Sequence, residues 1–266
     1  MSHWKRIPNP SSWRRLSLAT WSRPHDPSVY GWLDLDVSRA LAYLEASNRE
    51  AAAKVTLTHL VGKAVAAALA SQPDVNAIVR RGAVYQRATV DVFFQVAYER
   101  GGNLSGATIR EADKKSVVEI ARELSERASA IRARAKHELA SSDARLSRVP
   151  AALRRAVMRS AETLNYAWGW DLSRLGVPRD AFGSAMVTNV GMFGLPHAFA
   201  PLVPFSRVPI VVAVGAVRDA PVAEARAVVV RPVMTLGVTL DQRVLDGFQA
   251  GLSWRTVLYK RAEFRK

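Results

Sequence analysis

Strand candidates are spread along the whole chain and alternate with amphipathic helices, and this mixture is what most constrains the fold. The expected strands are residues 29–37, 75–79, 83–85, 90–98, 185–190, 210–217 and 228–240. The expected helices are residues 38–49, a helix that starts at Thr56 or Thr58 and stops before Pro73, residues 116–137, a basic helix within 150–170, and one that begins near Asp246. No internal repeat or low-complexity linker separates these elements. The pattern predicts one α/β domain with a mixed sheet and flanking helices.

The two ends of the chain are unusually basic. The first 28 residues are rich in Pro, Ser, Trp and Arg without periodicity, so we expect an arm over residues 1–28 and a folded domain over residues 29–266. The arm would dock on a surface through its tryptophans, Trp4, Trp13 and Trp21. The net charge of the chain is +15, and residues 1–27 and 251–266 carry more than half of this excess. Such ends attract an acidic or phosphorylated partner, although solvated tails that aid solubility are an equally good interpretation.

Several functional classes are excluded by what the sequence lacks. It has no cysteine, which removes disulfides, thiolate metal sites and a cysteine nucleophile. Its five histidines are scattered without metal-ligand spacing, so we expect no metal. Dinucleotide, P-loop and serine-hydrolase motifs are missing as well. The most apolar run, residues 208–217, is far shorter than the roughly 20 residues that span a bilayer. We therefore expect a cytoplasmic protein with no membrane contact, and no nucleic-acid partner because no recognition motif accompanies the charge.

Residues 183–194, GSAMVTNVGMFG, form the first segment with a candidate chemical role. An apolar strand runs into the polar pair Thr188 and Asn189 and then into a glycine-flanked turn. A hydroxyl held at the edge of a cavity could stabilise an oxyanion. An ordinary strand end followed by a turn explains the same residues.

Residues 239–247, TLDQRVLDG, form the second such segment. A strand ends, Asp241 and Asp246 bracket four residues, and a helix is expected after Gly247. Asp246 would lie near the N-terminus of that helix, where the helix dipole favours a carboxylate. From composition alone, a capped strand–turn–helix junction with an Asp–Arg pair is the simpler interpretation.

Together the two segments resemble the catalytic domain of the 2-oxoacid dehydrogenase (dihydrolipoamide) acyltransferases, which shares its fold with chloramphenicol acetyltransferase. The C-terminal signature of that family is D-H-R-x-x-D-G, and residues 241–247 occupy its place. The upstream signature resembles T-I-S-N-L-G-x-x-G, which residues 186–194 match. Residues 57–69, 73–77, 104–133, 209–215 and 231–234 resemble further family segments in order. The resemblance covers about residues 14–260 and implies a chloramphenicol acetyltransferase-like α/β fold with a helical insertion at about residues 138–180.

The resemblance also implies a mechanism of CoA-dependent acyl transfer. In that family the histidine of D-H-R acts as general base on the thiol of CoA or dihydrolipoamide, and a hydroxyl from a neighbouring subunit stabilises the tetrahedral intermediate. By this correspondence the catalytic positions here are Gln242, Thr188 and Asp246, and the residues that support the site are Asn189, Arg243, Asp241 and Gly247. The site would lie in a channel between subunits of a homotrimer or a larger trimer-based assembly. CoA or acyl-CoA would be a substrate, and no residue is assigned to bind it.

One departure from the family pattern affects the chemistry directly. The base position holds Gln242, and a glutamine amide does not titrate near neutral pH and cannot accept a thiol proton as an imidazole does. Loss of a general base typically costs about 10²–10⁴ in rate, while positioning alone leaves some transfer. We therefore expect weak activity. His197, which follows the first segment, is a less favoured substitute base because its place in the sequence does not bring it to position 242.

Full-length members of the family carry a lipoyl domain and a subunit-binding domain, and neither pattern occurs in these 266 residues. A lipoyl group would therefore act in trans, or the acyl acceptor is another thiol or small molecule. The partners implied are components of a 2-oxoacid dehydrogenase complex. The alternative hypothesis is a non-catalytic trimeric scaffold, or a CoA-binding relative, that has lost its base.

Overall fold

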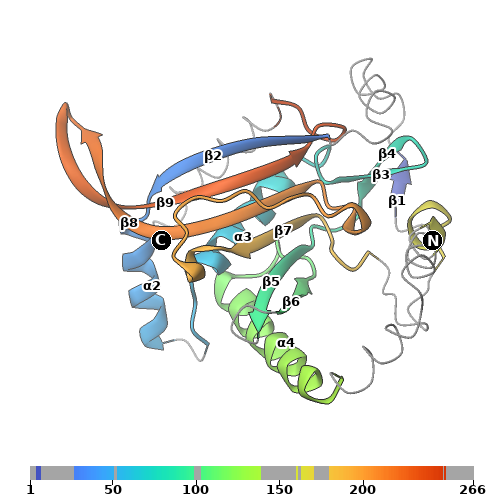
Figure 1. Cartoon of the computed structure of the whole chain (residues 1–266), viewed down its shortest axis with the longest axis horizontal. Coiled ribbons are helices and arrows are strands. Elements are labelled where there is room, and N and C mark those ends of the chain that lie inside the picture. Colours follow the sequence, from blue (N-terminus) through green and yellow to red (C-terminus); the bar gives the residue numbers. More distant parts are fainter. Residues whose placement is uncertain are drawn as a thin grey trace.

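The computed structural model describes residues 4–6, 27–50, 53–98, 103–138, 160, 163–170, 180–247 and 249. Over this part of the chain the strands form two sheets, a large one in the order β2-β9-β8-β7-β5-β6 and a small one in the order β1-β4-β3 (Figure 1). The strands are β1 (Trp4–Arg6), β2 (Ser28–Asp36), β3 (Ala77–Arg80), β4 (Ala83–Arg87), β5 (Val92–Tyr98), β6 (Asn103–Ile109), β7 (Ala185–Asn189), β8 (Ile210–Glu224) and β9 (Ala227–Asp241). The mixed α/β architecture predicted from the sequence is confirmed.

The large sheet is mixed because β7 runs parallel to both of its neighbours, β5 and β8, whereas the other pairs are antiparallel. The first four residues of β7 are buried, as expected of a parallel strand that is covered on both faces. Parallel strands need a connection that leaves the sheet and returns. The residues that connect β7 to β8 include the 3-10 helices η4 (Gly191–Phe193) and η5 (Pro204–Ser206).

Helices cover one face of the large sheet, and they are α2 (Ser38–Glu50), α3 (Leu57–Ser71) and α4 (Val117–Glu138). The main hydrophobic core lies between this face and α3, where Val187 and Val212 are buried with Val61. The close approach of α3 to the sheet requires Gly62, because a Cβ atom there would lie 2.2 Å from the ring of Phe94.

Residues 195–203, which we call the strap, cross the opposite face of the large sheet. A Cβ atom on Gly215 of β8 would lie 2.2 Å from the carbonyl oxygen of Pro196, and one on Gly237 of β9 would lie 2.0 Å from that of Ala198. A glycine inside a strand often marks such a close backbone approach. Side chains alternate between faces along a strand, so Thr188 shares this strap face with Met186, which packs in the smaller core beneath it.

Residues 4–6 of the predicted N-terminal arm belong to the small sheet. Residues 4–6 form β1, which pairs antiparallel with β4 of the same chain, and Trp4 lies opposite Arg87. The other two tryptophans of the predicted arm, Trp13 and Trp21, lie outside the described residues. Most of the predicted insertion, about residues 138–180, also lies outside them. Its best described part is a π-helical turn, η2 (Thr163–Ala167), where the sequence predicted a basic helix.

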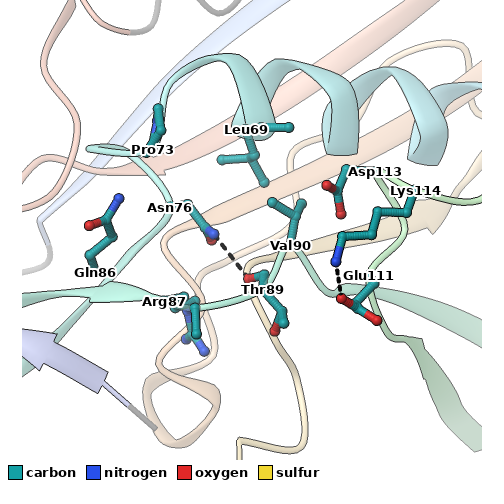
Figure 2. A pocket seen from close by; sticks show the side chains of 12 residues that line it. Leu69, Pro73, Asn76, Gln86, Arg87, Thr89, Val90, Glu111, Asp113 and Lys114 are labelled. Carbon is teal, nitrogen blue, oxygen red and sulfur yellow. Dashed lines mark hydrogen bonds and ion pairs between the residues drawn. The ribbon is translucent and has the colours of Figure 1, made fainter.

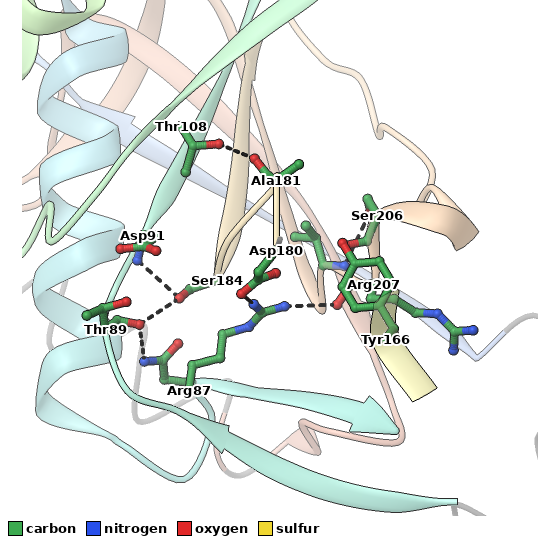
Figure 3. A network of polar contacts seen from close by, with 12 residues as sticks. Arg87, Thr89, Asp91, Thr108, Tyr166, Asp180, Ala181, Ser184, Ser206 and Arg207 are labelled. Atoms are coloured by element: carbon green, nitrogen blue, oxygen red, sulfur yellow. Dashed lines mark hydrogen bonds and ion pairs between the residues drawn. The ribbon is translucent and has the colours of Figure 1, made fainter. Parts of the chain in front are cut away.

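A buried polar network joins the small sheet to the start of β7 (Figure 3). The guanidinium of Arg87 on β4 forms an ion pair with Asp180, and both side chains are almost fully buried. Burial lowers the pKa of Arg87 to about 10, so the arginine remains charged at neutral pH. Nearby, Asp91 forms an ion pair with Arg110 at 2.5 Å, and its backbone N–H donates to Ser184 Oγ at 3.2 Å. Charged groups fixed in this way hold the two sheets together.

No helix among the described residues is long and apolar enough to cross a membrane.

Candidate functional site

The first predicted site segment lies at the end of β7. Thr188 is a buried residue of β7 and is paired in register with Ala213 of β8. Asn189 follows, and its carboxamide makes two contacts: Nδ2 donates to Thr58 Oγ1 at 2.9 Å, and Oδ1 accepts the Met192 N–H at 3.1 Å. Asn189 therefore ties the end of β7 to the start of α3 and to the following turn. These two hydrogen bonds fix the backbone next to Thr188.

The glycine-flanked turn after Thr188 has a steric cause. A Cβ atom on Gly191 would lie 2.7 Å from backbone atoms of Gly215 and Ala216 on β8. Gly194 ends the short helix η4 in the left-handed region with φ of 76°, a conformation that glycine adopts readily. The glycines thus let the chain turn sharply against β8.

The second predicted segment forms a tight turn at the end of β9. The carboxylate of Asp241 makes a bidentate ion pair with Arg243, with Nε to Oδ1 at 3.0 Å and Nη2 to Oδ2 at 2.8 Å. Its Oδ1 also accepts the Arg243 N–H at 2.9 Å. The Asp241 carbonyl accepts N–H groups from Val244 and Leu245, whose side chains are buried. The Asp–Arg pair expected from the sequence therefore organises the turn that carries Gln242.

Gln242 lies at the edge of the large sheet, beside the start of β2. Its backbone N–H donates to the carbonyl of Pro27 at 2.9 Å, and its side chain is half-buried. The structure thus places Gln242 at a fixed backbone position, next to a turn held by an ion pair.

Asp246 caps the segment that follows. Its Oδ1 accepts the Gln249 N–H at 3.0 Å, and the Gln249 side chain accepts the Asp246 N–H at 3.3 Å. This reciprocal pair is the arrangement of a capping box at a helix N-terminus, and the described residues Gly247 and Gln249 are helical. Asp246 therefore holds the start of the predicted last helix. Gly247 is exposed and nothing crowds its Cα, so space does not require glycine there.

Within one chain Thr188 and Gln242 do not meet. Thr188 pairs with Ala213, Ala213 pairs with Gly237, and Gln242 follows five residues after Gly237. At about 3.3 Å per residue and about 4.8 Å per strand, their Cα atoms lie about 19 Å apart. Acyl transfer requires the reacting groups to be in contact, so the two side chains cannot act on one substrate from the same chain.

The structure also locates the alternative base. His197 is exposed on the strap between the two residues that cross Gly215 and Gly237. Since Gln242 lies five residues of chain beyond Gly237, His197 is not its neighbour. Within one chain His197 is thus not adjacent to Gln242, and its role as a substitute base stays a prediction.

Two features of the site region escaped the sequence analysis. The sequence suggests Thr58 only as a possible helix cap, whereas in the structure Thr56 is the N-cap of α3 and Thr58 accepts the hydrogen bond from Asn189. The strap was not predicted, although glycines inside the apolar segments 210–217 and 228–240 were the available signal.

A cavity of about 210 Å³ lies elsewhere, between the end of α3, the β4–β5 connection and the turn at residues 111–114 (Figure 2). Asn76 lines it, and its Nδ2 donates to the Thr89 carbonyl at 3.0 Å. Neither Thr188 nor Gln242 lines this cavity. In the part of the chain that the structure describes, no group of three or more histidine or acidic side chains could hold a metal ion.

Comparisons with known proteins agree with this geometry. The fold is similar to that of chloramphenicol acetyltransferase, which superimposes with a TM-score of 0.53 at 12% identity, covering 96% of this chain and 97% of that one. The family model for the 2-oxoacid dehydrogenases acyltransferase (catalytic domain) matches residues 14–145 and 179–258. The chain belongs to this family.

Two relatives show how far the likeness extends. The dihydrolipoyllysine-residue acetyltransferase component of the acetoin cleaving system of Bacillus subtilis is 26% identical over 197 residues, which cover 74% of this chain and 39% of that protein. The chain thus spans about two fifths of that relative's length. The dihydrolipoamide acetyltransferase of Azotobacter vinelandii, whose structure was studied for the role of a serine, a histidine and an asparagine in catalysis, superimposes with a TM-score of 0.63 at 20% identity, covering 96% and 87% of the two chains.

Proposed function

We propose that this chain transfers acyl groups between CoA and a second thiol, such as that of a dihydrolipoyl group, at a site formed by Gln242, Asp246 and Thr188. The single observation that carries the proposal is the turn after β9, where the Asp241–Arg243 ion pair presents Gln242 and Asp246 caps the next helix. This turn holds the family signature, in which only the base is replaced.

The spacing of these residues supports the assignment. In the Azotobacter vinelandii enzyme the histidine and the asparagine are four positions apart, and the serine precedes the histidine by 52 positions. Here Asp246 follows Gln242 by four positions, and Thr188 precedes it by 54. A Thr188 hydroxyl would donate a hydrogen bond to the oxyanion that forms when a thiol attacks the thioester carbonyl.

We further propose that the site is completed by a second copy of the chain, in a trimer or a larger trimer-based assembly. The separation of about 19 Å between Thr188 and Gln242 supports this, because each needs a partner residue from elsewhere. The strap face also carries exposed aromatic side chains: Trp32 is 68% exposed, and Tyr30 packs edge-on against Phe199 at 5.5 Å. Exposed apolar surface of this kind commonly marks an interface.

Gln242 would make the reaction slow. The attacking thiol must lose its proton, and a carboxamide cannot take it. Only the small thiolate fraction present at neutral pH, for a thiol pKa near 8.5, would react. The chain's own contribution is then positioning of the two thiol carriers and stabilisation of the oxyanion by Thr188.

The test is acetyl transfer from acetyl-CoA to dihydrolipoamide, followed by chromatography of acetyl-CoA and CoA. We expect Gln242→His to raise the rate by about 10²–10⁴. Thr188→Val, made in that background, should lower the rate by about 10²–10³. Gln86→His on the small sheet is the matched control and should not raise the rate. A rate that is unchanged by Gln242→His would contradict the assigned role of position 242.

The second candidate function is a non-catalytic scaffold or CoA-binding relative, which the glutamine at the base position favours. It predicts that the native chain transfers no acetyl group while CoA still binds, as measured by calorimetry, and that any activity appears only in Gln242→His. Activity of the native chain would exclude this candidate.

A further inference from the structure

A basic and aromatic surface lies on the small sheet, apart from Thr188 and Gln242. We define it by five residues: Arg80, Arg81, Tyr85, Trp168 and Trp170. The tryptophans belong to the stretch 146–178 that the family model does not match. The tryptophans therefore lie outside the part of the chain that carries the family pattern, and the chemistry proposed above does not use the surface.

The aromatic rings hold the arginines in place. The Arg81 guanidinium lies 4.9 Å from the ring centroid of Trp168, and that of Arg80 lies 5.1 Å from the ring of Tyr85. Arg80 Nε also donates a hydrogen bond to the Tyr166 carbonyl. A guanidinium stacked in this way loses less side-chain entropy when it binds a partner.

The segment that carries the tryptophans is itself anchored. Tyr166 is buried against Ile78 and Tyr85, and its hydroxyl donates to the Ser206 carbonyl at 3.4 Å; Figure 3 shows Tyr166 beside Ser206. The backbone N–H groups of Trp168 and Trp170 donate to carbonyls of the preceding turn. The rings are therefore presented by a packed element.

All charged residues of the small sheet are basic. Strands β1, β3 and β4 and the two-residue turn between β3 and β4 carry five basic residues, Lys5, Arg6, Arg80, Arg81 and Arg87, and no acidic one. Arg87 is neutralised by buried Asp180. Arg81 is exposed in the turn, and among the residues that the structure describes no carboxylate pairs with it. Within the described part of the chain, the surface therefore presents positive charge at Arg81 without a counterion.

Trp168 and Trp170 are 61% and 57% exposed, which is unusual for side chains that gain so much free energy by burial. Tryptophan, tyrosine and arginine are the residue types enriched at protein interfaces and their binding hot spots. A guanidinium binds a carboxylate through two parallel hydrogen bonds. We propose that this surface binds a carboxylate-rich segment of a protein partner, with the tryptophans packing on its apolar side chains.

The geometry favours a carboxylate-rich protein over a single-stranded nucleic acid. Sequence-tolerant nucleic-acid binding uses open aromatic faces on which bases stack along a basic groove. Here one face of Trp168 and one face of Tyr85 already carry a guanidinium. A guanidinium that lies over a ring keeps the N–H donors along its edge, and these suit carboxylates.

The test uses a fluorescently labelled oligoglutamate peptide that contains one leucine, with binding measured by anisotropy. Arg81→Glu should weaken binding about tenfold or more, and Trp168→Ala should weaken it about threefold. The matched control is Arg226→Glu, which reverses the charge of an exposed arginine that also lies in a two-residue hairpin turn, between β8 and β9. That turn lies at the far end of the molecule from β3 and β4 (Figure 1), so the control should change binding by no more than about twofold.

Three outcomes would overturn the proposal. Equal weakening by Arg81→Glu and Arg226→Glu would show attraction to net charge alone. Tighter binding of a single-stranded oligonucleotide of equal charge, abolished by the same variants, would assign the surface to nucleic acid. A change of oligomeric state in Arg81→Glu, seen by sedimentation, would make the surface an interface between copies of this chain. If circular dichroism shows Arg81→Glu to be unfolded, Arg81→Gln replaces it in every comparison.

Discussion

The histidine at the start of α3 makes stability depend on pH in a direction that the structure defines. His59 is only 9% exposed, and burial lowers its pKa from 6.5 to about 4. Its Nδ1 accepts the Thr56 N–H at 3.1 Å, and its ring meets Phe94 edge-on at 6.3 Å between centroids. The folded state therefore holds this imidazole neutral.

The direction in which the unfolding free energy changes with pH follows from proton linkage. Between pH 6.5 and about 4 the unfolded chain binds a proton at His59 and the folded chain does not. The stabilisation is thus fully present above pH 6.5 and is lost as the pH falls towards 4. At 1.36 kcal/mol per pH unit, the loss is roughly 1 kcal/mol at about pH 5.5 and roughly 3 kcal/mol at about pH 4.5 and below.

Urea unfolding at a series of pH values, compared between the native chain and His59→Gln, isolates this contribution from that of the carboxylates. A glutamine oxygen can accept the same N–H but does not titrate in this range. We expect the difference in unfolding free energy between the two chains to shift by these amounts, with the native chain losing more. His197→Gln is the control, because His197 is exposed. Parallel pH profiles for the native chain and His59→Gln would refute the reasoning.

Three substitutions test other parts of the structure by urea unfolding at neutral pH. Gly237→Ala should cost about 1–3 kcal/mol, because its Cβ would lie 2.0 Å from a carbonyl of the strap; no loss would mean that the strap does not cross there. Asp180→Asn should cost about 3–5 kcal/mol, because it leaves Arg87 buried without its counterion. The control is Asp219→Asn, at an exposed position of β8. If Asp180→Asn cost less than this control, the buried ion pair would be contradicted. Thr58→Val should cost about 1 kcal/mol, because Asn189 Nδ2 loses its acceptor, whereas Thr58→Ser should retain the bond.

The sequence predicted the local structure well where burial imposes a pattern. The strands at 185–190, 210–217 and 228–240 correspond to β7, β8 and β9, because their core-facing halves must be apolar. β8 nevertheless continues to Glu224 and β9 begins at Ala227. Beyond the irregularity between Val214 and Val217 the hairpin leaves the sheet (Figure 1). Most of its residues there are exposed, so no hydrophobic pattern marks them, and its turn uses Ala225 and Arg226 at positive φ without a glycine.

The sequence could identify the residues of the candidate site but not their distances. The segments around Thr188 and Gln242 are visible as strand ends with polar residues. An Asp–Arg pair and a glycine-flanked turn were predicted there, and the structure shows that the aspartate of the pair is Asp241. Their separation depends on strand order, which non-local pairing determines. The contact between Thr58 and Asn189 joins residues 131 positions apart, and no local pattern encodes such a pair.

The separation of Thr188 and Gln242 allows a direct test of whether two copies share one site. The double variant Thr188→Val, Gln242→His has the base but no hydroxyl, and the native chain has the hydroxyl but no base. Each alone should be slow. If the site combines Thr188 of one copy with position 242 of the next, as in a ring of heterologous contacts, co-refolding equal amounts should give about one quarter of sites that are complete, since each complete site requires one particular choice from each chain. Acetyl transfer should then rise to about one quarter of the rate of the single variant Gln242→His. A mixture that is only as active as the average of its two components would show that each site is built from a single chain, and the proposed site would be wrong.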